Sequence, residues 1–321
     1  MELYEPFKSL EFLPNQCYLC GSQEEIQYNL VFPEWYLESF ELIQKPFRLL
    51  NESYKNYEDL NIPICHLCDQ SYLRPLQEKI SRGFSGGYES MKKINADDLF
   101  LWVSNILYGI IHIEIRTAIE DHENEQKSKL GHFEPLAISP SLLIKFSGVH
   151  LFLQGLRVPM ERDDFQPFSY WLLPLKKEEK ENLFEYRDDM STLIFSLTAK
   201  DFGFIICLQD QEMNQAYHRK LEEKLRGKEL SFQEFQEFRA RVFYSAYLFN
   251  PIPKYLSLRP VNHQQKFTIL SEPLPQGKNN LFKPWNIKTY AQVLEAFWKP
   301  WGITKTQILE NEEKPMSLFD I

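Results

Sequence analysis

Four cysteines in two short, identical spacings are the residues of this chain that most clearly indicate a chemical role, which is metal binding. Cys17 and Cys20 form one Cys-x-x-Cys pair, and Cys65 and Cys68 form the second. A Cys-x-x-Cys turn presents two thiolates from one tight loop, and two such turns complete the tetrahedral, all-sulfur site that structural zinc prefers. The sequence therefore predicts one zinc ion held by four thiolates.

Two other interpretations of these cysteines stay open. Disulfides need an oxidising compartment, whereas the opening residues Met1–Glu5 do not resemble a signal peptide, so we expect reduced thiols in the cytoplasm. A thioredoxin-like redox site would use one Cys-x-x-Cys pair beside a βαβ unit rather than two pairs on separate turns. The fifth cysteine, Cys207, lies in an apolar run, and we expect it to be a buried thiol without a chemical role.

Composition indicates a folded chain that does not cross a membrane. With 321 residues, of which 43% are hydrophobic, the chain can bury a full core. The longest apolar stretch, from Leu99 to Ile115, carries Ser104, Asn105, His112 and Glu114. It is short and polar for a membrane span, so it predicts a buried helix and no membrane partner. No glycine-rich phosphate loop or metalloprotease helix is present, and we expect no small-molecule cofactor.

Charge is unevenly distributed along the chain. Residues 1–215 hold 20 basic and 34 acidic side chains, whereas residues 216–321 hold 16 basic and 11 acidic ones. Affinity for nucleic-acid backbones comes largely from counterion release, so the acidic part is a poor candidate for such binding. The basic part is the better candidate, although mixed Lys and Glu residues are also typical of a solvated helix face.

The remaining patterns predict an α+β fold with two domains. Residues 1–90 are expected to form the zinc-binding domain, with a helix from Trp35 to about Asn51 that Pro46 kinks or ends. Residues 91–321 are expected to form a mostly helical body with a small antiparallel sheet. Within that sheet, Thr192–Leu197 should pair with Phe204–Leu208 across a turn that carries Asp and Gly.

A capping box at Ser231 predicts a helix that extends to about Phe249. Apolar residues recur along it at intervals of three and four, which predicts one stripe facing the core. Arg239 and Arg241 fall between these positions, so we expect both arginines to face outward. An outward orientation suits contact with nucleic-acid phosphates, and the two arginines are the candidate nucleic-acid-binding residues.

Two runs of residues around the cysteines resemble a known family. Cys17–Ser22 is followed by Asn29–Trp35, with the sequence Asn-Leu-Val-Phe-Pro-Glu-Trp, and Cys65–Gln70 is followed by Leu76–Glu78. These runs resemble the HNH endonuclease-like treble-clef proteins of bacteria. The resemblance implies a treble-clef zinc finger and a setting in bacterial defence or mobile elements. Further motifs, among them Asp98–Trp102, are similar to those of uncharacterised bacterial proteins that share this finger.

The chain departs from the family pattern at the position of the catalytic histidine. Aligning Val-Phe-Pro with the family places Leu30 in the histidine slot and Asn29 in the preceding carboxylate slot. Asp69 occupies a slot that can bind a metal, but it lacks its partner, and His66 would have to reach across the groove to replace the missing base. The resemblance therefore predicts a degenerate, non-catalytic module that recognises nucleic acid or a protein partner. The alternative is an active metal-dependent HNH endonuclease that cleaves DNA or RNA.

Overall fold

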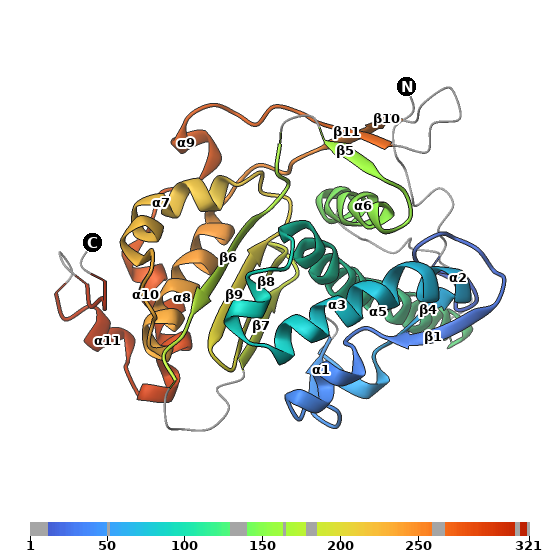
Figure 1. Cartoon of the computed structure of the whole chain (residues 1–321), viewed down its shortest axis with the longest axis horizontal. Coiled ribbons are helices and arrows are strands. Elements are labelled where there is room, and N and C mark those ends of the chain that lie inside the picture. The colour runs from blue at the N-terminus through green and yellow to red at the C-terminus, as the bar shows by residue number, and fades with distance from the viewer. Residues whose placement is uncertain are drawn as a thin grey trace. The chain divides into compact units, whose positions relative to one another are not determined.

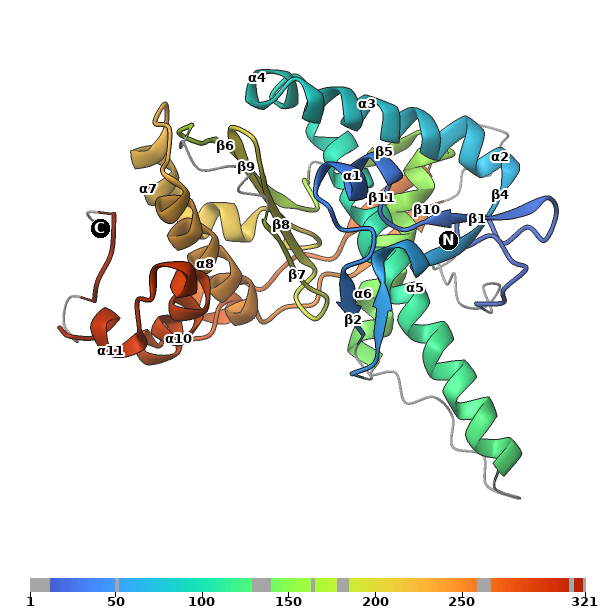
Figure 2. The same ribbon diagram turned by 90° about the horizontal axis from the view of Figure 1, so that it is seen from below.

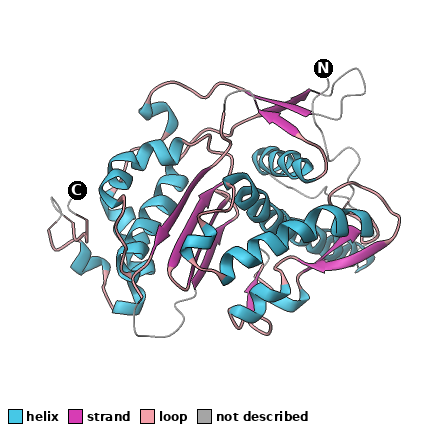
Figure 3. Ribbon diagram, viewed as in Figure 1, coloured by secondary structure: helices cyan, strands magenta, loops and turns pink. Residues whose placement is uncertain are grey.

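The computed structural model shows a mixed α+β chain with small sheets (Figure 1; Figure 3). It describes residues 12–49, 52–128, 140–162, 165–177, 185–258, 267–311 and 315–319. The chain divides into two compact units. Unit 1 comprises Met1–Arg82, Ile94–Asp164 and Lys254–Glu272, and unit 2 comprises Gly83–Lys93, Phe165–Pro253 and Pro273–Ile321.

These units do not follow the expected division between residues 90 and 91. Unit 1 combines the cysteine-bearing segment with the long apolar helix and with a later segment, Lys254–Glu272. The reason is that the long apolar helix packs on the strand Asn61–Cys65 of the cysteine-bearing segment as well as on the helix Pro140–Leu153. The order of residues along the chain does not predict packing between segments that are distant in the sequence.

Unit 1 contains both Cys-x-x-Cys turns and the elements that position them. Its elements, in order, are β1 Ile26–Leu30, α1 Glu34–Ser39, β2 Pro46–Arg48, β3 Tyr54–Asn56, β4 Asn61–Cys65, α2 His66–Cys68, a π-helical segment Asp69–Leu73, α3 Arg74–Ser85, α5 Ala96–Ser128, α6 Pro140–Leu153, β5 Met160–Arg162, β10 Tyr255–Leu258 and β11 Phe267–Ser271. The last three residues of α3 belong to unit 2. β1 pairs antiparallel with β4, β2 pairs antiparallel with β3, and β11 pairs antiparallel with β10 and parallel with β5.

The helix expected over Trp35–Asn51 is wrong beyond its first turn. α1 ends at Ser39, and Glu41 has a φ of 52°, a left-handed conformation that a helix cannot continue through. Pro46, which we expect to kink or end that helix, lies beyond it and begins the strand β2.

The long apolar helix α5 is the core element of unit 1. Its Ala96–Glu120 stretch is long and apolar enough to cross a membrane, and 83% of its most apolar window is buried inside the protein. α6 packs alongside α5 (Figure 2). The approach of α5 to Val31 and Ile62 depends on Gly109, because a Cβ atom at this position would lie 2.9 Å from a Val31 methyl carbon. The expectation of a buried helix agrees with this packing.

Unit 2 is built on a four-stranded antiparallel sheet in the order β6-β9-β8-β7. The strands are β6 Ser169–Pro174, β7 Glu185–Asp189, β8 Ile194–Ala199 and β9 Phe202–Cys207. The helices are α4 Tyr88–Met91, α7 Met213–Leu225, α8 Phe232–Leu248, α9 Lys278–Leu281, α10 Ile287–Trp298 and α11 Lys305–Ile308. The helices α7, α8 and α10 lie on one side of the sheet (Figure 1). The expected pairing of β8 with β9 is confirmed, with Ala199 opposite Phe202 across Lys200 and Asp201.

The helix α8 packs on two sides within unit 2. Phe235, Phe238 and Val242 join a buried cluster that includes sheet residues, and Tyr244 and Leu248 join a second cluster with α10. The predicted capping box is present, because the Ser231 hydroxyl accepts a hydrogen bond from the Glu234 amide and the Glu234 side chain accepts one from the Ser231 amide. Burial on two sides leaves this helix little free surface, in contrast to the single buried stripe that its periodicity predicts.

Candidate metal centre

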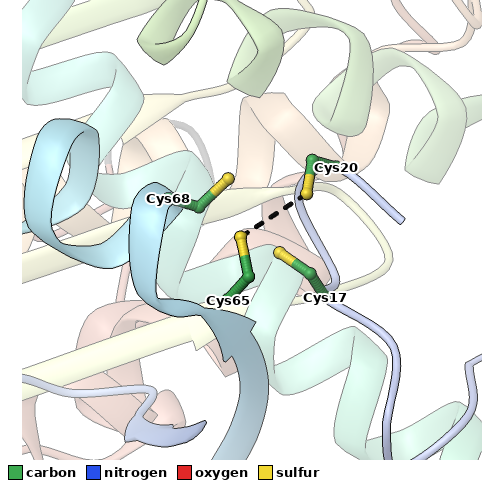
Figure 4. Close-up of side chains that lie close together, drawn as sticks. All are labelled: Cys17, Cys20, Cys65 and Cys68. Carbon is green, nitrogen blue, oxygen red and sulfur yellow. Dashed lines mark hydrogen bonds between the residues drawn. The ribbon is translucent and has the colours of Figure 1, made fainter. Parts of the chain in front are cut away.

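The four cysteines of the two Cys-x-x-Cys pairs lie together in unit 1. Cys17 and Cys20 belong to a turn that precedes β1, whereas Cys65 is the last residue of β4 and Cys68 ends the short helix α2. β1 pairs with β4 so that Ile26 lies opposite Cys65, and this pairing brings the two turns together. The four side chains point toward a common centre (Figure 4).

The distances between the sulfur atoms suit a metal ion better than a disulfide. All four Sγ atoms lie within 4.8 Å of one another. The Sγ atoms of Cys20 and Cys65 are 3.6 Å apart, well beyond the roughly 2.05 Å of a disulfide bond. A tetrahedral zinc ion with Zn–S bonds of about 2.3 Å places its sulfur ligands roughly 3.8 Å apart. The geometry therefore fits one ion at the centre of the four thiols, which the structure records as free.

The electrostatics of the cluster also favour a bound cation. Hydrogen bonds from the thiols of Cys20 and Cys68 lower the pKa of Cys17 far below its usual range. Hydrogen bonding with Cys17 in turn raises the pKa of Cys20 to about 11 and raises that of Cys68 well above its usual range. A thiolate at Cys17 therefore opposes the ionisation of Cys20 and Cys68. A divalent cation at the centre of the cluster would offset this opposition.

Buried polar side chains from α5, from α6 and from the short helical segment Gln154–Leu156 after α6 hold the first Cys-x-x-Cys turn. The His150 ring nitrogen Nε2 lies 3.0 Å from the Tyr18 carbonyl oxygen, and the Gln154 amide donates to the Leu19 carbonyl oxygen at 2.9 Å. The Tyr18 hydroxyl donates a hydrogen bond to Asn105. Burial lowers the pKa of His150 to about 4, so the ring is neutral at pH 7 and can donate from Nε2 to the carbonyl. Sequence reasoning missed these contacts because they join residues more than 80 positions apart.

Asp69 forms the centre of a second polar cluster, between β1 and the helix that follows Cys68. Only 2% of this residue is exposed. Its Oδ1 accepts a hydrogen bond from the Asn29 side chain, and its Oδ2 accepts hydrogen bonds from Gln70 at 2.7 Å and from Arg74 at 3.2 Å. Asp69 is the first residue of the π-helical segment, a local widening that often marks functional positions in helices.

The family resemblance also concerns Leu30 and His66. Leu30 is the last residue of β1, lies opposite Asn61 and is half-buried. His66 is exposed, and it is not among the residues whose ligand atoms converge on the metal centre. In the described part of the chain, the four-cysteine cluster is the one group of three or more potential metal ligands that converges in this way.

The expected outward orientation of Arg239 and Arg241 is wrong. Arg239 has a fully buried side chain, which donates to the Ser196 hydroxyl at 2.8 Å and forms an ion pair with Glu185 at 3.1 Å. Arg241 is 18% exposed and forms an ion pair with the buried Glu237 at 2.7 Å. Because α8 is covered on two sides, the positions between its apolar residues also face protein. Both guanidinium groups are engaged inside unit 2.

The arrangement of the four cysteines defines what the centre can do chemically. All four positions of a tetrahedral ion would be filled by protein sulfur atoms, which leaves no open position for a substrate or a reactive water. Such a site stabilises a fold and does not perform metal-assisted hydrolysis.

No protein-family model, curated protein or solved structure matches this chain.

Proposed function

We propose that the four cysteines bind one zinc ion and that residues 17–85 form a treble-clef finger around it. The order of elements supports this proposal, because a Cys-x-x-Cys turn is followed by the antiparallel pair β1 and β4 and then by a helix whose start carries the second pair. Four closely spaced sulfurs without oxygen or nitrogen ligands favour zinc over harder cations. A four-thiolate centre persists most readily under reducing conditions, and we therefore place the protein in the cytoplasm.

We further propose that this finger is a degenerate HNH-like module that recognises a partner without cleaving nucleic acid. The observation that carries this proposal is the state of Asp69, both of whose carboxylate oxygens accept hydrogen bonds from protein donors. The Arg74 guanidinium supplies the positive charge beside this carboxylate, which a catalytic cation would otherwise supply. Leu30, in the position that the family resemblance assigns to the general base, has no atom that can accept a proton.

A protein is the partner that the charge distribution favours. Unit 1 holds 16 basic and 25 acidic side chains, and unit 2 holds 20 of each. A unit with a formal net charge of −9 repels a phosphate backbone, whose binding depends on basic side chains. The finger also exposes Leu67 at 62% and Tyr28 at 51%, and large apolar side chains of this kind are suited to protein interfaces.

The competing function is an active metal-dependent endonuclease, and a nicking assay separates the two. Zinc-loaded protein is incubated with supercoiled plasmid in Mg²⁺, Mn²⁺ and Ni²⁺, in parallel with the Asp69→Asn variant. We expect no cleavage above the buffer control from either protein. Cleavage by the wild type that requires a divalent ion and disappears in Asp69→Asn would establish the endonuclease instead.

A binding measurement separates protein recognition from nucleic-acid recognition. Fluorescence anisotropy with labelled single-stranded and double-stranded DNA and RNA, at low and physiological salt, would detect the salt-dependent affinity that phosphate contacts produce. We expect no saturable binding to any of these probes. Saturable binding that weakens steeply with salt would assign the module to nucleic-acid recognition.

A further inference from the structure

Backbone amide groups hold part of the first Cys-x-x-Cys turn. The Ser22 amide donates to the Cys20 sulfur at 3.4 Å, and the Gly21 amide donates to the Cys17 carbonyl at 2.8 Å. The two residues between the cysteines, Tyr18 and Leu19, are each 1% exposed. Their carbonyl oxygens are therefore away from solvent, and such groups need hydrogen-bond donors from the protein.

One helix provides both donors. His150 and Gln154 are four residues apart, so their side chains project from the same face of the helical segment that α6 begins. The exposed fractions are 3% for His150 and 6% for Gln154. Nε2 of His150 contacts the Tyr18 carbonyl at 3.0 Å, and Nε2 of Gln154 donates to the Leu19 carbonyl at 2.9 Å. The two middle carbonyls of the turn are thus each bound by a buried side chain from the same helix.

Further contacts hold these two donors in place. The Arg157 guanidinium donates to the Gln154 side-chain oxygen at 2.9 Å, which fixes the amide so that its nitrogen faces Leu19. The His150 ring packs against the Tyr108 ring of α5 with a centroid distance of 5.2 Å. On the other side of the turn, Asn105 of α5 accepts a hydrogen bond from the Tyr18 hydroxyl. Side chains from α5 and from the helical segment that α6 begins therefore hold the turn.

We propose that His150 and Gln154 are positioning residues of the metal centre, which hold the Cys17–Cys20 turn in its metal-binding shape. This inference rests on the proposed zinc centre. A Cys-x-x-Cys turn that is ordered before the metal arrives loses less conformational entropy when it binds, and it therefore retains the metal more tightly. Groups that orient metal ligands from outside the coordination sphere typically change metal affinity by about 10–100-fold when they are removed.

The same contacts make the finger part of unit 1 and not an independent domain. A free-standing finger would meet solvent at the Tyr18 and Leu19 carbonyls, whereas here α6 covers them. A purely structural role for His150 and Gln154 would lower the stability of unit 1 without changing how tightly the folded protein holds zinc. Metal affinity, measured on folded protein, separates these two roles.

The test compares zinc affinity in variants that remove one donor each. His150→Phe keeps an aromatic ring beside Tyr108 but removes the donor, whereas His150→Gln retains an amide that can reach the carbonyl. Gln154→Leu removes the second donor, and Ser104→Ala, which removes a buried hydroxyl without a hydrogen-bond partner in the described structure, serves as the control. Zinc affinity is measured by competition with a chromogenic chelator, and Co²⁺ absorption spectra report the geometry of the four-sulfur site.

We expect about 10–100-fold weaker zinc affinity and an altered Co²⁺ spectrum in His150→Phe and Gln154→Leu. In His150→Gln and Ser104→Ala we expect zinc affinity close to that of the wild type. Wild-type affinity in folded His150→Phe and Gln154→Leu would overturn the inference. A wild-type protein that binds no zinc would instead overturn the proposed metal centre.

If the two weakened variants do not fold, Arg157→Met provides the decisive comparison. It leaves both donors in place but frees the Gln154 amide to rotate, so we expect a measurable loss of zinc affinity. Unchanged affinity in Arg157→Met would then overturn the inference.

Discussion

The side-chain amide of Asn29 donates a hydrogen bond to the carboxylate of Asp69, and this contact joins β1 to the first turn of the helix that follows Cys68. Asp69 is 2% exposed, and Gln70 and Arg74 donate to its other oxygen. The carboxylate therefore ties the β1–β4 strand pair to the helix that follows Cys68.

Asp69→Ala should destabilise unit 1 because it leaves the Asn29 amide without its partner in a half-buried position. Loss of a hydrogen-bond partner inside a protein typically costs about 1–3 kcal/mol. The matched control is Glu52→Ala, which breaks the Arg48–Glu52 ion pair on the surface, where both side chains are more than half exposed. We expect the control to change stability by less than about 1 kcal/mol. Urea denaturation of both variants gives the comparison, and equal stability would contradict a structural role for Asp69.

The convergence of the four cysteines is the feature of this molecule that the sequence predicts best. Two Cys-x-x-Cys pairs are a local pattern, and the geometry they require is nearly independent of the remaining chain. The capping box at Ser231 and the pairing of β8 with β9 are local in the same sense. The capping box and the strand pairing depend on residues that are close in sequence. The cysteine cluster depends on the ability of four side chains to reach one ion.

The features that the sequence did not predict depend on packing between distant segments. Arg239 is buried because α8 is covered on two sides, by the sheet and by α10, and periodicity within one helix cannot show a second partner. The contacts of His150 and Gln154 with the Cys17–Cys20 turn span more than 130 positions. The local sequence predicts neither the burial of Arg239 nor the contacts of His150 and Gln154. Other buried polar residues could have formed hydrogen bonds of the same kind.

Gly203→Ala should destabilise unit 2 strongly. A Cβ atom at position 203 would lie 2.3 Å from a ring carbon of Phe235, which is fully buried between β9 and the cluster around it. Overpacking of this kind typically costs about 1–3 kcal/mol, and the closeness of this contact places the expected cost at the upper end. The double variant Gly203→Ala with Phe235→Leu should cost less than the sum of the two single changes. Thermal melts of the three variants test this, and additive costs would contradict the contact.

The stability of unit 2 should depend on pH through Asp210. Its Oδ2 accepts hydrogen bonds from Ser169 and Asn214, and its Oδ1 is buried without a hydrogen-bond partner among the described residues. Burial raises the pKa of Asp210 to about 6 from an ordinary value of 3.8. Between these values the folded unit keeps a proton that the unfolded chain has released. The contribution of this group to stability is therefore complete below about pH 4 and is lost as the pH rises through 6.

The loss amounts to roughly 3 kcal/mol, since each pKa unit corresponds to about 1.4 kcal/mol. Asp210→Asn keeps an acceptor oxygen for Ser169 and Asn214 and cannot ionise. The difference in unfolding free energy between Asp210→Asn and the wild type should therefore increase in favour of the variant from pH 4 to pH 7. A difference that stays constant with pH would show that Asp210 does not titrate in this way.

Cys65→Ser should prevent unit 1 from folding at neutral pH. Binding of structural zinc by four thiolates supplies about 10–16 kcal/mol in small finger domains, which equals or exceeds the stability of most domains. Cys207→Ala is the matched control, because it also removes a buried thiol but lies in β9 of unit 2. We expect Cys65→Ser to lose both zinc and part of the far-ultraviolet circular dichroism, and Cys207→Ala to keep both. Retention of bound zinc by Cys65→Ser would contradict the ligand assignment.

X-ray absorption at the zinc edge of the purified protein determines whether Cys17, Cys20, Cys65 and Cys68 together bind one zinc ion. We expect one zinc per chain, surrounded by four sulfur atoms at about 2.3 Å and by no nitrogen or oxygen ligand. Protein that is folded without zinc, or that contains a Cys17–Cys20 or Cys65–Cys68 disulfide, would contradict this expectation.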